Sequence, residues 1–224
     1  MASVKQAFLL FSFFLTITYV SFVNAGFSYE NFWSDKLYWR TKPELIKQIE
    51  KRKIIATAVK DERWWLKGAG IVNAPADYVF KYSQNYDRLR KIENYFKKVE
   101  YDSKSQELYL EQKFLGRIMV SRFFLDPVTD KGERRLYFRM LIGPFKDSEG
   151  VILFSDASGY DLEDKTEKCE VAVVGRLKGE LKWIPDFAFG FAIEAVMQHV
   201  AKSLRDSAEK DWLARRDRKQ GVSL

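Results

Sequence analysis

The sequence predicts an α+β fold in which one long C-terminal helix covers the apolar face of a curved antiparallel sheet of about seven strands. Three observations carry this prediction. Apolar and polar residues alternate through six consecutive segments between residues 99 and 181, as expected of strands. Short turn sequences such as Asp126-Pro127 separate these segments, and short links join antiparallel neighbours. From residue 183 to 219 the pattern changes to the period of a helix.

The long helix is predicted to start at Pro185, because proline lacks an N–H and the first helical turn has no partner for one. Asp186 beside it suits the positive end of the helix dipole. Gly190 would let another element, or a ligand, approach the helix backbone. An apolar stripe recurs at steps of three and four and must be covered; it consists of Phe189, Ile193, Val196, Met197, Val200 and Leu204.

The N-terminus, residues 1–25, has the pattern of a secretory signal peptide. It contains an early cation at Lys5, an apolar run over residues 7–23 and a small residue, Ala25, where a signal peptidase would cut. The alternative is an uncleaved membrane anchor, since the run approaches the roughly 20 residues that span a bilayer. Serine and threonine dilute the run. We therefore expect cleavage near Ala25, which gives a secreted or periplasmic protein.

Residues 26–53 are interpreted as a lead-in that contains a short helix opening at Pro43. The remaining residues, 54–220, are predicted to form one domain, since their length suits a single core. Its first two strands, over residues 54–59 and 63–72, are expected to form a hairpin in which glycines mark a bulge or a close approach of backbone.

Two short helices should follow this hairpin, the first opening at Pro75 and the second over residues 86–95. The six strands after them are expected at residues 99–102, 108–114, 117–125, 134–142, 151–157 and 169–181. Their alternation predicts one apolar sheet face and one wet face. The strand at 117–125 is apolar on both sides, so its interior set stays open.

The order of these elements resembles the START-like (SRPBCC) superfamily, and more narrowly its polyketide cyclase/dehydrase and coenzyme Q-binding branch. The local motif behind the resemblance is Ala74-Pro75-Ala76-Asp77, followed by two short helices, six strands and a long helix. This resemblance implies a helix-grip fold, in which the sheet and the C-terminal helix enclose a hydrophobic cavity.

Such a cavity would bind a lipid or another hydrophobic small molecule, because pockets for apolar ligands are lined mainly by apolar side chains. Met140 and Met197 would suit an adaptable wall, since methionine is flexible and polarizable. For each candidate taken singly, a place in a closed core is favoured over ligand contact. The candidate ligand-binding residues are Phe138, Met140, Phe154, Val173, Leu177, Trp183, Phe189, Ile193, Met197 and Val200.

Catalytic chemistry has little support in the sequence. Glu194, beside the apolar stripe, is the one weak candidate for a general acid or base, and an outward position is the alternative. His199, the single histidine, lies near the edge of the apolar stripe and is expected to have a structural or surface role. Cys169, the single cysteine, is expected to be a half-buried inert thiol. We predict no metal site, because one histidine and one distant cysteine do not form one. No nucleotide-binding glycine motif is present, and no cofactor is expected.

The chain has a formal net charge of +7. Its densest cationic group, at the end of the long helix, complements the helix dipole and is either a solvated tail or a transient contact with an anionic membrane surface. Nucleic acid is not expected as a partner of an exported protein. The group consists of Arg215, Arg216, Arg218 and Lys219.

The sequence therefore favours an exported, non-catalytic binder or carrier of a lipid or similar hydrophobic molecule. A cyclase- or dehydrase-type enzyme that uses the same cavity is the first alternative. An interaction module with a closed core is the second.

Overall fold

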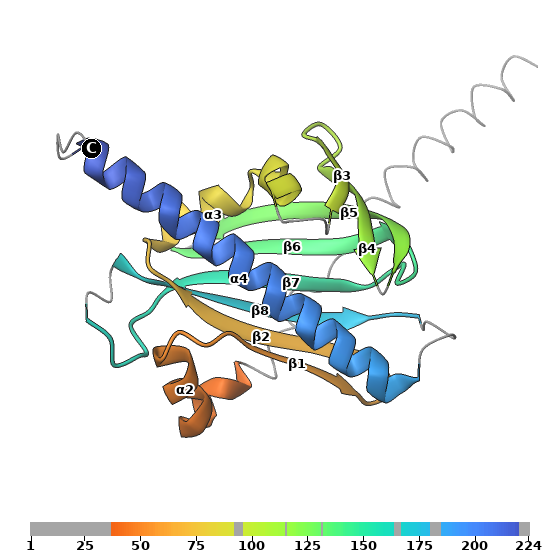
Figure 1. The fold of residues 1–224 in the computed structure, drawn as a ribbon, viewed down its shortest axis with the longest axis horizontal. Coiled ribbons are helices and arrows are strands. Elements are labelled where there is room, and N and C mark those ends of the chain that lie inside the picture. Colours follow the sequence, from red (N-terminus) through yellow and green to blue (C-terminus); the bar gives the residue numbers. More distant parts are fainter. Residues whose placement is uncertain are drawn as a thin grey trace, which may run out of the picture. The chain divides into compact units, whose positions relative to one another are not determined.

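The computed structural model describes residues 37–91, 96–114, 116–130, 132–163, 167–179 and 185–219. Its sheet has eight antiparallel strands in the order β1-β2-β8-β7-β6-β5-β4-β3, and one long helix crosses it (Figure 1). The predicted α+β class is confirmed. The strands are β1 (Ile55–Lys60), β2 (Trp64–Val72), β3 (Phe96–Asp102), β4 (Glu107–Phe114), β5 (Arg117–Asp130), β6 (Glu133–Ile142), β7 (Glu149–Asp156) and β8 (Cys169–Leu177).

The helices also follow the predicted order. The predicted second short helix is a 3₁₀ helix that begins at Tyr86, and residues 92–95 lie outside the described ranges. The long helix starts one residue after Pro185, whose carbonyl accepts the hydrogen bond from Phe189 N–H at 2.9 Å. The helical elements are η2 (Tyr38–Thr41), α2 (Pro43–Glu50), α3 (Ala76–Ser83), η3 (Tyr86–Lys91) and α4 (Asp186–Lys219).

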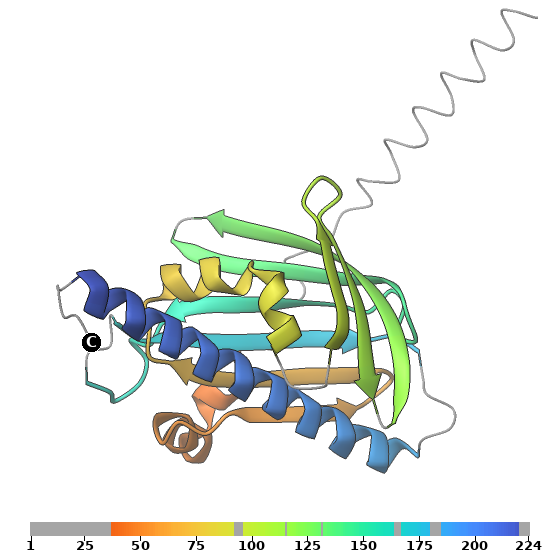
Figure 2. The same ribbon diagram turned by 45° about the horizontal axis from the view of Figure 1, so that its top comes forward.

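Two helices and a 3₁₀ helix, α3, α4 and η3, lie on the same side of the sheet, which we call the inner face (Figures 1 and 2). The alternation of strand residues places one set of side chains beneath them. In β6 this set includes Leu136, Phe138 and Met140, as the sequence predicts, and all three belong to the apolar clusters of the inner face.

The strand whose interior set the sequence left open, β5, is oriented by its register. Phe123 pairs with Met140 and Leu125 pairs with Phe138. Phe123 and Leu125 therefore lie on the inner face with these partners. Ile118 and Val120 lie on the other side and are exposed by 54% and 41%. Position in the sheet, not hydrophobicity, therefore selects the inner set.

The prediction that the outer face is wet is wrong around Glu170. This residue of β8 is fully buried, because η2 and α2 pack over the outer side of β2, β7 and β8. Trp39 Nε1 donates to Glu170 Oε1 at 2.9 Å, the Tyr160 hydroxyl donates to the same oxygen at 2.6 Å, and Arg40 forms an ion pair with Oε2. A buried charge is costly unless paired, and these three donors satisfy it.

Gly190 is where another element approaches α4, as the sequence predicts. A Cβ atom at this position would lie 3.1 Å and 3.2 Å from two atoms of the Trp64 indole of β2. The glycine thus lets α4 lie close over the β1–β2 edge of the sheet. The predicted close approach at Gly68 is also confirmed, since a Cβ there would be 2.8 Å from the carbonyl oxygen of Ile55 on β1.

Two predicted segments fall outside the described residues. They are the signal peptide, residues 1–25, and the first part of the lead-in, residues 26–36. The rest of the lead-in, from Tyr38 through α2, packs on the sheet through Trp39 and Ile49, both fully buried.

Candidate functional site

The floor of the candidate site is the inner face of the sheet around Phe138. Its ring lies across two glycines of the neighbouring strands, Gly150 and Gly175, which pair with each other. A Cβ at Gly150 would be 2.8 Å from Phe138 Cε1, and one at Gly175 would be 3.5 Å from Phe138 Cζ. Because neither glycine has a side chain, the aromatic ring lies down on the strands and does not rise toward α4.

One closed cluster lies at the start of α4. Phe189 packs against Trp64 with ring centroids 5.0 Å apart and against Phe145 at 5.5 Å. Met140 and Leu177 of the sheet complete the cluster, and both are buried. These side chains fill the space between the sheet and the first turns of α4.

A second closed cluster lies beneath α3. Phe154 of β7 meets Phe80 edge-to-face at 5.4 Å, and both are buried. Val79 and Leu136 belong to the same cluster. The inner face is therefore densely packed at this place as well.

Half-buried apolar side chains next to these clusters lie on the sheet and on α4. On the sheet these side chains are Val173 of β8 and Phe138 of β6, and both are half-buried. On α4, Ile193, Met197 and Val200 belong to the stripe that contains Phe189, and they too are half-buried. We call the surface formed by these half-buried side chains of the sheet and α4 the inner apolar surface.

The predicted ligand-binding residues thus divide into three groups. Met140, Phe154, Leu177 and Phe189 are buried in the closed clusters. Trp183 lies outside the described residues. The five half-buried residues of the inner apolar surface are Phe138, Val173, Ile193, Met197 and Val200. Of these, Phe138 packs against the cluster beneath α3 and Ile193 against the cluster at the start of α4. Sequence periodicity does not separate the groups, because the side chains share one stripe or one strand face and differ only in what packs beside them.

Glu194, the weak catalytic candidate, has a structural contact. Its Oε1 accepts a hydrogen bond from the backbone N–H of Ala58 on β1, at 2.7 Å. His199 is exposed on the helix, as expected. Cys169 is fully buried, and burial raises the pKa of its thiol, with the charges of Asp156 and Glu170 adding to the effect. A high pKa disfavours the nucleophilic thiolate.

The C-terminal half of α4 is fastened by polar contacts. Asp211 accepts from the Tyr78 hydroxyl of α3 at 2.5 Å and forms ion pairs with Arg88 at 3.5 Å and Arg215 at 2.9 Å. The hydrogen bond from Tyr78, and then these guanidinium groups, lower the pKa of Asp211. Burial and the same carboxylate raise the pKa of Tyr78, so the tyrosine stays a neutral donor.

A second carboxylate fastens α4 to the start of the sheet. Glu209 receives Arg52 Nη2 at 2.7 Å on each of its oxygens, and the backbone N–H of Asn73 at 2.8 Å. Arg205 of α4 donates in turn to the carbonyl of Arg52 at 2.7 Å. The sequence shows these residues only as helix charges, because their partners lie more than 100 positions away.

The cations at the end of α4 have partners within the same helix. Arg215 donates to Asp211, Arg216 lies 3.9 Å from Asp217, and Arg218 Nε donates to the carbonyl of Ala214 at 3.0 Å. The last contact is the one expected where a helix ends with free carbonyls. The side chain of Lys219 lies outside the described part of the chain.

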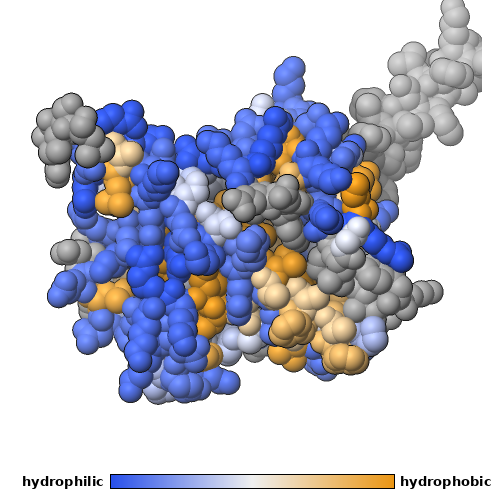
Figure 3. All heavy atoms as spheres, viewed as in Figure 1, coloured by the Kyte–Doolittle hydropathy of each residue, from blue (hydrophilic) through white to orange (hydrophobic). Residues whose placement is uncertain are grey.

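Figure 3 shows that the visible surface over the C-terminal half of α4 is mostly hydrophilic and that hydrophobic residues gather toward its start. Phe187 and Phe191, exposed by 82% and 75%, belong to these first turns. Among the described helices, none is long and apolar enough to cross a membrane. The described residues also hold no group of three or more histidine, cysteine or carboxylate side chains placed to bind a metal ion.

Comparison with known proteins finds matches in fold but not in sequence. No family model and no curated protein matches the chain. Among solved structures, a START superfamily protein from Mycobacterium smegmatis matches with a TM-score of 0.52 at 13% identity, over 65% of this chain and 97% of that one.

Two further solved structures match in the same way. A STAR-related lipid transfer protein from Xanthomonas axonopodis has a TM-score of 0.52 at 15% identity, over 69% of this chain and 93% of its own. The Zhui aromatase/cyclase from Streptomyces sp. R1128 has a TM-score of 0.50 at 18% identity, over 67% of this chain and 94% of its own. Together with the eight-stranded sheet and the long C-terminal helix, these matches show that the chain has the START-like helix-grip fold.

Proposed function

We propose that this protein is an exported, non-catalytic binder or carrier of a lipid or another hydrophobic small molecule. The ligand would lie between the sheet and α4, against the inner apolar surface. The observation that carries the proposal is the set of half-buried apolar side chains on facing elements, Val173 on β8 and Met197 and Val200 on α4, beside a Phe138 ring that lies flat on two glycines.

Burial of apolar surface supplies the driving force for such binding, about 25 cal/mol for each Å² removed from water. Side chains that are already fully packed gain nothing from a ligand, whereas half-buried ones do. The two closed clusters would hold the sheet and the helix at a fixed separation, and the polar contacts of Glu209 and Asp211 would keep the C-terminal half of α4 in place.

The known proteins of this fold support the proposal at the level of ligand class. One neighbour is named as a lipid transfer protein and another as an aromatase/cyclase. The first name supports a lipid ligand, and the second supports the cyclase-type alternative. The non-catalytic part of the proposal rests on Glu194, whose carboxylate holds the backbone of β1, and on the buried, high-pKa thiol of Cys169.

Recovery of a bound molecule tests the proposal. Delipidated protein is incubated with a total lipid extract of its native host, re-isolated by gel filtration and extracted, and the released molecules are identified by mass spectrometry. We expect one class of apolar molecule, at up to one per chain, identical in mass to a component of the starting extract. An altered molecule would favour the cyclase-type alternative. Recovery of no molecule would favour the interaction module with a closed core.

Export is a separate part of the proposal and has its own measurement. The pattern of residues 1–25 supports cleavage after Ala25. Mass spectrometry of the protein from its native host should then find Gly26 as the first residue, in a secreted or periplasmic fraction. An intact Met1 in the membrane fraction would contradict export by cleavage.

A further inference from the structure

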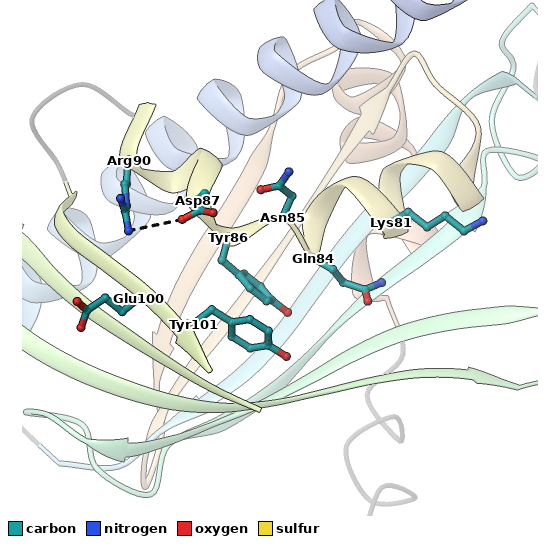
Figure 4. A pocket seen from close by; sticks show the side chains of 8 residues that line it. All are labelled: Lys81, Gln84, Asn85, Tyr86, Asp87, Arg90, Glu100 and Tyr101. Carbon is teal, nitrogen blue, oxygen red and sulfur yellow. Dashed lines mark ion pairs between the residues drawn. The ribbon is translucent and has the colours of Figure 1, made fainter. Parts of the chain in front are cut away.

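A polar pocket lies away from the inner apolar surface, between α3, η3 and the edge strand β3. Its volume is about 560 Å³, within the range of about 300–1,000 Å³ typical of small-molecule sites. Tyr86 separates it from the core, because this residue is only 7% exposed and belongs to the cluster beneath α3. The lining residues are Lys81, Gln84, Asn85, Tyr86, Asp87, Arg90, Glu100 and Tyr101 (Figure 4).

Two tyrosines form the aromatic wall of this pocket. The rings of Tyr86 and Tyr101 lie 4.5 Å apart at an angle of 51°, and Figure 4 shows their hydroxyls on the same side. Tyr101 is 38% exposed, so part of its ring is available to a ligand. An aromatic ring beside polar groups offers an apolar surface and hydrogen bonds at once.

Most charged groups in the pocket already have partners. Arg90 lies 3.5 Å from Asp87 and donates through Nε to the carbonyl of Val99 at 3.2 Å. Glu100 pairs with Lys98 at 3.1 Å. Lys81 extends away from the two tyrosines in Figure 4. The pocket therefore offers little net charge to an ionic ligand.

The polar groups of the pocket that could hydrogen-bond a ligand directly are neutral. Among the residues that the structure describes, the hydroxyls of Tyr86 and Tyr101 and the side-chain amide of Asn85 have no hydrogen-bond partner. Phenol and amide groups each donate and accept. A ligand rich in hydroxyl groups has the same double capacity, whereas a carboxylate only accepts, a phosphate accepts through most of its oxygens, and an ammonium group only donates.

From this chemistry we infer that the pocket binds a saccharide, with a sugar ring against Tyr101 and its hydroxyls on Tyr86 and Asn85. Asp87, Arg90 and Glu100 also line the pocket, and their planar polar groups would reach further hydroxyls of the sugar. This site is independent of the hydrophobic ligand proposed above, because it lies on the other side of Tyr86 and shares none of the five half-buried residues.

Saturation-transfer NMR with the full-length protein tests the inference. The probes are disaccharides of glucose, galactose, mannose and N-acetylglucosamine, with inorganic phosphate and choline as charged comparators. At least one disaccharide should receive saturation and bind. Tyr86→Phe and Asn85→Ala should weaken it by about 2- to 10-fold, as expected for one lost hydrogen bond, and Tyr101→Ala should abolish the signal.

Two matched variants control for unspecific effects. Tyr38→Phe removes a hydroxyl that bonds Thr57, far from the pocket, and Gln198→Ala removes an exposed amide on α4. Both should bind the disaccharide like the parent protein, and every variant should still unfold in one cooperative transition at a denaturant concentration well above that of the binding assay. The inference is overturned if no disaccharide binds, if the pocket variants bind it unchanged, or if phosphate or choline displaces it.

Discussion

Glu194 and Ala58 join the long helix to the edge of the sheet. The carboxylate of Glu194 accepts a hydrogen bond from the backbone N–H of Ala58, with 2.7 Å between oxygen and nitrogen. Ala58 belongs to β1, which is an edge strand. Edge strands carry N–H groups without a strand partner, and such groups invite pairing with other chains. Glu194 therefore fastens α4 and covers one of these groups.

The first prediction concerns this contact. Glu194→Ala removes the acceptor and should lower the free energy of unfolding by about 1–3 kcal/mol, as for a hydrogen bond to a charged group. Glu194→Gln keeps an acceptor oxygen and should lose less. Urea denaturation measures both, with Gln198→Ala on the exposed side as control. If Glu194→Ala is as stable as the parent, or if Glu194→Gln changes the chemical identity of a bound molecule, the structural role is wrong.

A second prediction concerns the buried carboxylate of the outer face. Glu170→Ala leaves Arg40, Trp39 and Tyr160 without their shared acceptor. Removal of one partner from a buried ion pair costs about 3–5 kcal/mol. Glu62→Ala, at an exposed carboxylate in the β1–β2 turn, is the control and should be near neutral. Equal unfolding free energies for the two variants would show that Glu170 does not hold η2 to the sheet.

The third prediction is a pH dependence at Asp211. Its pKa is lowered in the folded state, chiefly by the hydrogen bond from Tyr78. A lowered folded-state pKa gives stability that is present above the unfolded value, near pH 4, and is lost as pH falls through the folded pKa. The parent should therefore exceed Asp211→Asn in unfolding free energy at pH 7, and the difference should shrink below about pH 4. A difference that stays constant, or grows, on acidification would contradict the ionic role.

A fourth prediction concerns the floor of the candidate site. Gly150→Ala would place a Cβ against the Phe138 ring and 2.6 Å from the carbonyl oxygen of Val174. Such overpacking should cost at least about 1–3 kcal/mol of unfolding free energy. Gly159→Ala is the matched control, because a Cβ at that position would have no neighbour within 4 Å and its backbone is compatible with alanine. Similar stability of both variants would mean that the Phe138 ring does not rest on Gly150.

The regular part of the fold could be predicted from the sequence because each strand and α4 has its own period. Leu136, Phe138 and Met140 show the sheet face directly, and Pro185 marks the helix start within one residue. The interior side of β5 could not be predicted, because both of its faces are apolar. Pairing of Phe123 with Met140, a tertiary fact, decides it.

Contacts between segments far apart in the sequence explain the other differences between the sequence predictions and the structure. The alternation around Glu170 predicts a solvent-exposed carboxylate, but Trp39, 131 positions away, donates to it and covers it. The polar pocket brings Tyr86 and Tyr101 together from two elements, and no local pattern indicates that pairing. The sequence presents the candidate ligand-binding residues as one apolar set, and only packing separates the buried Phe154 from the half-buried Val173.

The most direct test of hydrophobic ligand binding compares two neighbouring positions of α4. Met197→Trp adds bulk on the half-buried stripe, and Gln198→Trp adds the same side chain on the exposed side. Binding of an apolar fluorescent fatty acid is titrated for both, and stability is measured by urea denaturation. The account predicts that the parent and Gln198→Trp bind the probe, while Met197→Trp loses binding and keeps nearly the parent's stability. If the parent binds no probe and Met197→Trp loses about 1–3 kcal/mol through overpacking, the space is closed core and the account is contradicted.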